Sequence, residues 1–138
     1  MSFDVLSEIN YLAAAVAAVA YGTLGSIWYA TPVFGKAWQS AVGLTDEQSR
    51  SGQGMLIVQT LIGYFLAAVT LSAIARTIET TELMDGVVLG LFVGIGVVAT
   101  GVWINNAYQR GSTALLWINA VYGLIGYVIM AVIVTMWD

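Results

Sequence analysis

WINNAYQRGSTALLWINAVY, residues 103–122, is the stretch that decides the fold. In it, two apolar runs meet across a short polar link, residues 109–112. Asn105 and Asn119 each lie seven residues from Ser112, so a helical hairpin would hold their amides at similar depth. The sequence on both sides is apolar enough to place that depth inside a membrane.

The composition points to a membrane protein. Of the 138 residues, 59% are hydrophobic and 9% are charged, whereas a soluble domain has about 25% charged residues. A chain of this length cannot bury so much apolar surface in a soluble core, but lipid can cover it. We therefore predict an all-α integral membrane protein that forms a single domain over residues 1–138.

Four segments are long and apolar enough to cross a bilayer, at about residues 9–30, 55–75, 86–105 and 114–136. About 20 helical residues cover a hydrocarbon core of roughly 30 Å. Pro32 interrupts the helical pattern after the first span. Residues 33–42 then place apolar side chains on one face but are too few to span, which predicts a short amphipathic helix in the interface. A capping-box pattern at residues 45–48 predicts a polar helical start to the second span.

Small residues recur every four positions along the spans, which is typical of helix-packing faces in lipid. The ladder Gly86, Gly90 and Gly94 could contact another helix of the same chain or another subunit, and we favour contact within the chain. The predicted packing residues are Ala14, Ala18, Gly22, Gly63, Gly86, Gly90, Gly94, Gly123 and Gly126.

Neutral polar side chains fall at one depth in all four spans. Such a layer could bind a small polar solute or partly replace the hydration shell of an ion. Alternatively, its members could hydrogen-bond across helices and hold the bundle together, and this second interpretation is the one we favour. The candidate polar layer comprises Tyr29, Gln59, Asn105, Asn106, Asn119 and Tyr122.

The chain lacks the residues that several kinds of chemistry require. The chain has no histidine and no cysteine, so the commonest general base, the commonest metal ligand and any thiol nucleophile are absent. No charged residue lies within the core of a span, which disfavours a proton-coupled carrier. We expect no enzyme activity, no cofactor and no metal. The net charge of −4 argues against nucleic acid as a partner.

Basic residues suggest an orientation. Lys36, Arg50 and Arg110 lie on the side of the loops at residues 31–54 and 108–112, and Arg76 lies on the side of the termini and the 77–85 link. The excess predicts both termini outside the cytoplasm. The first ten residues contain no Lys or Arg, so we expect no cleavable signal there. The predicted interfacial anchors are Trp28, Lys36, Trp38, Trp103 and Trp117.

Two parts of the chain carry distinctive motifs. The first part carries Asn10, the Trp-Tyr at residues 28–29, Pro32, and the Phe-Gly-Lys-x-Trp at residues 34–38. The second carries Asn106, the Arg-Gly at residues 110–111, and the Ile-Asn-Ala-x-Tyr at residues 118–122. In these motifs the chain resembles a prokaryotic membrane family known as domain of unknown function 1761. Family members often have His directly after that Tyr, where this chain has Gly123. The resemblance implies four spans and a cytoplasmic-membrane location, and it supplies no activity.

These observations lead to three functional hypotheses. The favoured one is an oligomeric channel or facilitator for a small neutral or monovalent solute, because a neutral polar layer suits passive permeation. The second is a non-catalytic accessory subunit of a larger membrane complex. The third is a lipid or pigment binder. In each case we expect the lipid bilayer around the chain, and a second copy or a partner membrane protein beside it.

Overall fold

The computed structural model describes residues 1–137, and its regular elements are all helices. Four of its helical stretches are long and apolar enough to cross a membrane. They are α1 (Tyr11–Trp28), α4 (Gln53–Thr77), the run from α5 (Leu83–Val93) through η3 (Gly94–Ala99) to α6 (Thr100–Tyr108), and α7 (Thr113–Met136). Each predicted span matches one of them to within three residues at either end. The prediction of an all-α multi-pass membrane protein is therefore confirmed.

Side chains cap two of these helices at their first residues. The Asn10 carboxamide oxygen accepts from the Ala13 backbone N–H at 3.1 Å, and the Ser112 hydroxyl accepts from Leu115 at 3.1 Å. Each bond satisfies a donor that the first turn of a helix leaves free. The Asn10 amide nitrogen also donates to the Trp137 carbonyl at 3.0 Å, which ties the start of α1 to the end of α7.

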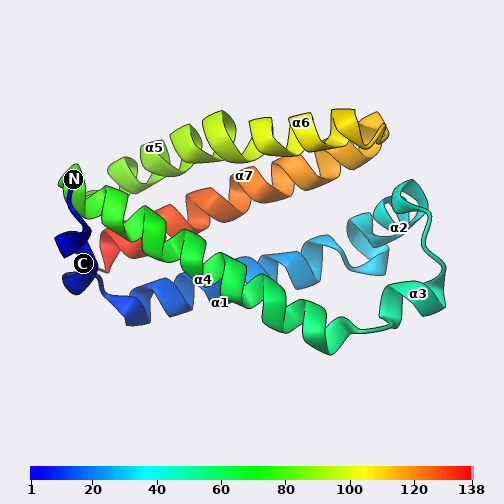
Figure 1. Ribbon diagram of the computed structural model, residues 1–138, viewed down its shortest axis with the longest axis horizontal. Helices are drawn as coiled ribbons and strands as arrows, with labels where there is room; N and C mark the ends of the chain where they lie inside the picture. The colour runs from blue at the N-terminus through cyan, green and yellow to red at the C-terminus, as the bar shows by residue number, and fades with distance from the viewer. Residues whose placement is uncertain (138) are drawn as a thin grey trace.

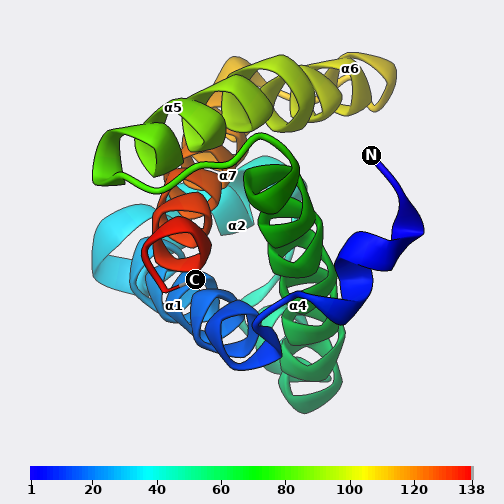
Figure 2. The same cartoon turned by 90° about the vertical axis from the view of Figure 1, so that its left-hand side faces the viewer.

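Helix α7 is the centre of the bundle, and α1, α4 and α5 pack around it (Figures 1 and 2). The glycine ladder of α5 lies directly on α7. A Cβ at Gly90 would be 2.5 Å from Cα of Val128, and one at Gly86 would be 2.9 Å from Cα of Val132. The ladder thus packs within the chain, because only glycine lets two backbones approach so closely.

Alanines hold α1 against α4 near the termini. Ala14 and Ala17 of α1 and Ala68 and Ala75 of α4 are almost completely buried, and they share one cluster with Met130 of α7. Towards their other ends α1 and α4 diverge, and the short helices α2 (Lys36–Val42) and α3 (Asp46–Arg50) lie at that end (Figure 1). The bundle is therefore closed at the end with the termini and wider at the end with α2 and α3.

The segment between α1 and α4 differs in detail from the predicted interfacial helix. It begins with a π-helical turn, η2 (Thr31–Gly35), and continues as α2, which packs against α7. The predicted capping box at Thr45 and Gln48 is present and starts α3. However, α3 is a separate helix rather than the beginning of α4, because Gly52 has φ +70° between them. A left-handed residue cannot continue a right-handed helix.

The expected packing glycines divide into two groups. A Cβ at Gly22, Gly123 or Gly126 would meet Leu61, Val98 or Tyr21 respectively, so each of these three glycines faces a neighbouring helix. Gly63 differs, because nothing lies within 4 Å of a Cβ built there. The first half of α4 has turned away from the bundle, and Gly63 lies on its outer side.

Candidate functional site

Three tyrosines from three helices stack in the middle of the bundle. The ring of Tyr21 (α1) lies 4.1 Å from that of Tyr64 (α4) and 4.7 Å from that of Tyr122 (α7) between centroids. Glycine makes room for them: a Cβ at Gly126 would overlap the Tyr21 ring, and one at Gly25 would be 2.6 Å from the Tyr122 hydroxyl. The cluster thus depends on small residues placed opposite large ones.

Two hydroxyl groups of this cluster, those of Tyr64 and Tyr122, form a directed chain of hydrogen bonds. Tyr122 donates its single proton to the Tyr21 carbonyl at 3.2 Å. The 2.9 Å contact between the Tyr64 and Tyr122 hydroxyls must therefore have Tyr64 as its donor. The chain runs from α4 through α7 to the backbone of α1.

A second set of bonds fastens the end of α1 to α7. The Tyr29 hydroxyl donates to Asn119 Oδ1 at 2.7 Å, and Trp28 Nε1 donates to the Ile118 carbonyl at 3.0 Å. Trp38 of α2 packs edge-on against Tyr29 with centroids 5.8 Å apart. Trp28 and Trp38, expected as interfacial anchors, are thus half-buried within the fold.

The remaining expected anchors lie on the surface. Trp103 and Trp117 are each 63% exposed, and Lys36 is also exposed. Positions of this kind suit aromatic and basic side chains at a membrane–water boundary.

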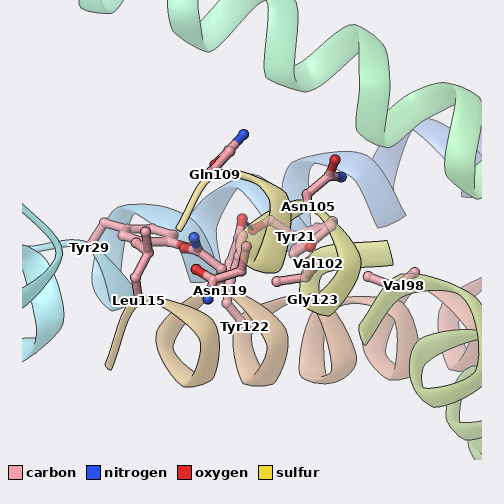
Figure 3. Close-up of a pocket in the computed structure, with 11 residues that line it drawn as sticks. Tyr21, Tyr29, Val98, Val102, Asn105, Gln109, Leu115, Asn119, Tyr122 and Gly123 are labelled. Carbon is pink, nitrogen blue, oxygen red and sulfur yellow. Dashed lines mark hydrogen bonds between the residues drawn. The ribbon is translucent and has the colours of Figure 1, made fainter. Parts of the chain in front are cut away.

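A pocket of about 320 Å³, which we call the amide pocket, lies among α1, α6 and α7 (Figure 3). Five of the six residues of the predicted polar layer line it: Tyr29, Asn105, Asn106, Asn119 and Tyr122. Tyr21, Gln109 and Gly123 also contribute, and none of the lining residues carries a formal charge. The structure therefore brings these five side chains together around one pocket.

The three asparagines of the pocket differ in what they bind. Asn106 Nδ2 lies 3.3 Å from the carbonyls of both Gly111 and Ser112, so it braces the link between α6 and α7. The side-chain oxygen of Asn119 accepts the hydrogen bond from the Tyr29 hydroxyl. Asn105 is exposed, and its side chain extends away from Asn119 and α7, as does that of Gln109 (Figure 3). The pocket therefore combines amides that are used structurally with amides that are open to a ligand.

Gln59 is the one predicted member of the layer that lies elsewhere. Its side chain is exposed, and it lines neither this pocket nor the larger cavity described next. Residues 57, 60, 61 and 64 face α1, and 100° per residue turns position 59 to the opposite side of α4. The polar layer therefore draws on three spans instead of four.

A larger cavity of about 860 Å³, which we call the α1–α4 cavity, lies where those two helices diverge. Its lining comes from α1 and α4, with α2 and α3 at one end. Tyr29 and Tyr122 line this cavity as well as the amide pocket. Their rings meet edge to face with centroids 5.0 Å apart, so together they form a wall between the two spaces.

Sequence reasoning missed two residues that organise this region, Tyr21 and Tyr64. Both are single tyrosines in the apolar interior of a span. A polar side chain at that depth usually faces the interior of the bundle, and this tendency was the available signal. Within residues 1–137, no group of three or more His, Asp or Glu side chains is placed to hold a metal ion.

Comparison with known proteins bears on the identity of the chain. No curated protein and no solved structure matches it significantly. A sequence model of one family, described as "Protein of unknown function (DUF1761)", matches residues 12–135. That range contains the tyrosine cluster, the amide pocket and the α1–α4 cavity. The chain therefore belongs to the DUF1761 family of proteins of unknown function.

Proposed function

We propose that the protein binds a small neutral or monovalent solute in the amide pocket and, as a homo-oligomer, lets it cross the membrane without catalysis. One observation carries the proposal: carboxamides and phenols from three spans line a 320 Å³ pocket that has no charged side chain. Small-molecule sites typically begin at about 300 Å³. We also propose that the protein lies in the cytoplasmic membrane of a prokaryote, with both termini outside the cytoplasm.

The lining chemistry favours a solute with both donors and acceptors. A carboxamide offers an acceptor oxygen and two N–H donors. Asn119 has its oxygen bonded to Tyr29, so its amide nitrogen is the group left for a ligand. Asn105 brings a complete carboxamide, since no polar atom of its side chain bonds a described residue. Neutral oxygens could also replace part of the hydration shell of a monovalent ion.

The proposal includes an oligomer because, within one chain, the bundle is tightly packed between the amide pocket and the termini. The half of the bundle near the termini is packed with Leu71, Met130, Val134 and alanines, each with an exposed fraction of 1% or less. Ser72 and Thr135 are the buried polar side chains there, among the described residues. A path for a polar solute would therefore run between copies, or would need these helices to separate.

Flux into liposomes tests the proposal. Purified protein should increase the flux of at least one member of a panel of monovalent ions and small neutral solutes. Asn105→Leu should reduce that flux strongly at unchanged thermal stability, because the side chain of Asn105 bonds no described residue. Asn119→Leu should abolish it, with some loss of stability because Tyr29 loses its acceptor.

Gln59→Leu is the matched control, because it makes a comparable amide-to-leucine change on the outer face of α4. It should leave the flux unchanged. Absence of flux across the whole panel, or equal losses in Gln59→Leu and Asn105→Leu, would refute the proposal. Absence of flux together with a stoichiometric partner in mild detergent would favour the accessory-subunit hypothesis.

A further inference from the structure

The α1–α4 cavity lies on the other side of the Tyr29–Tyr122 wall and has a different character from the amide pocket. Two facing stripes line it: Val19, Gly22, Thr23 and Ser26 on α1, and Leu56, Ile57, Thr60, Leu61 and Tyr64 on α4. Both stripes follow the three- and four-residue spacing of one helix face. The cavity is thus an elongated space between two spans, open where α1 and α4 separate.

The deep part of the cavity offers little hydrogen-bonding capacity. The hydroxyls of Thr23, Ser26 and Thr60 each donate to a carbonyl of their own helix, at 2.8, 3.2 and 3.0 Å. Their protons are used, so they present methyl groups, methylenes and acceptor oxygens but no free donor. Val19, Leu56, Ile57 and Leu61 add apolar side chains to this surface. Such a wall suits a hydrocarbon chain better than a polar solute.

The end of the cavity beside α2 and α3 carries polar and charged groups. Arg50 and Asp46 line it, together with Gln39, Ser49 and Gln53. Asp46 accepts from Gln39 Nε2 at 2.8 Å through one oxygen, and its other oxygen is free of described partners. Arg50 forms no ion pair with a described residue. The end therefore holds one cation and one anion, four residues apart on α3, that are not bonded to each other.

We infer that the α1–α4 cavity binds a phosphoethanolamine lipid, with an acyl chain between the helices and the headgroup at α3. Arg50 would bind the phosphate, for which guanidinium has matching donors. Asp46 would accept from the ammonium, whose N–H groups a trimethylated choline lacks. The volume of about 860 Å³ lies within the range of ligand sites. This inference stands independently of the solute proposed for the amide pocket.

Photo-crosslinking tests the inference. The probe is lysophosphatidylethanolamine with a diazirine in its acyl chain, diluted into phosphatidylcholine vesicles that contain the full-length protein. Label should concentrate on the two cavity-lining stripes, which are Val19, Gly22, Thr23 and Ser26 on α1 and Leu56, Ile57, Thr60, Leu61 and Tyr64 on α4. Arg50→Gln should lower the labelling about tenfold, as expected for the loss of a charge-assisted hydrogen bond. Asp46→Asn should remove the preference over a matching lysophosphatidylcholine probe.

Two matched controls separate cavity binding from surface lipid. Arg110→Gln removes an arginine from the α6–α7 link, at the same end of the bundle but outside the cavity (Figure 1), and should have no effect. Thr60→Trp fills the cavity and should suppress labelling. Thr70→Trp, at an exposed threonine of α4 that also bonds its own helix, should not.

Three results would overturn the inference. The first is label spread over outward residues such as Val58 and Ile62 and unaffected by Thr60→Trp. The second is equal labelling by ethanolamine, choline and unsubstituted phosphate probes. The third is displacement of the probe by free phosphoethanolamine, which would assign the site to a soluble headgroup compound. None of these results depends on solute flux, so the two proposals can fail separately.

Discussion

The two ends of the bundle are packed with different kinds of side chain. Near the termini, Ala14, Ala17 and Ala68 are completely buried, and the ladder glycines bring α5 onto the backbone of α7. At the other end, residues 55–58 of α4 are each more than half exposed, and tyrosines fill the space between helices. In lipid, helices associate through close backbone contact. Where large residues of α4 such as Leu61 and Tyr64 face α1, the helices separate and leave cavities.

The largest expected effect comes from adding one methyl group to the closed end. Gly90→Ala should lower the free energy of unfolding by about 2–3 kcal/mol, because the new Cβ meets a backbone atom of α7 that cannot move aside. Gly101→Ala in α6, where a Cβ meets nothing within 4 Å, should leave stability unchanged or raise it by up to about 1 kcal/mol. Denaturant unfolding in detergent measures both. Equal effects would mean that the two ends are packed alike.

An intermediate effect is expected at the boundary between the two ends, in the tyrosine chain. Tyr122→Phe removes two hydrogen bonds and should cost about 1–2 kcal/mol, whereas Tyr64→Phe removes one and should cost about 0.6 kcal/mol. The double variant should unfold like Tyr122→Phe alone, because the chain passes through Tyr122. Additive losses in this double-mutant cycle would show that the two hydroxyls act independently.

The smallest effect is expected on the outer face of the open end. Gly63→Ala should raise the free energy of unfolding by less than about 1 kcal/mol, since alanine has the higher helix propensity and the new methyl group meets nothing within 4 Å. The same unfolding measurement, made at several protein concentrations, provides the check. A loss of stability would reveal that another copy of the chain covers this face of α4.

Much of the architecture could be predicted because it depends on local composition. The four spans follow from runs of apolar residues, and the depth of Asn105 and Asn119 follows from their distance along the chain to Ser112. The spacing of the ladder glycines also predicts a close contact between helices. Gln59 shows the limit of this reasoning. Its depth was readable from its position in the span, but its direction depends on how α4 is rotated towards α1.

The amide pocket shows the same limit in another form. Five of its lining residues were expected at one depth, yet the bond from Tyr29 to Asn119 and the brace from Asn106 to the link were not predictable. Predicting either bond would require the crossing angle and the separation of two helices. Both would have to be accurate enough to place an atom to within a fraction of a side-chain length. Tyr21 and Tyr64, which lie on different spans, become neighbours only once those angles are set.

The sequence by itself determined that this chain is a four-span helical membrane protein with a neutral polar layer near one end. Hydropathy, spacing and small-residue repeats are properties of the sequence, and they do not depend on how the helices are arranged. Only the tertiary structure decided that α7 lies at the centre, that Tyr29 and Tyr122 divide two cavities, and that Gln59 faces away from both. Those features depend on rotation and crossing of helices, which arise from many weak contacts summed over the whole bundle.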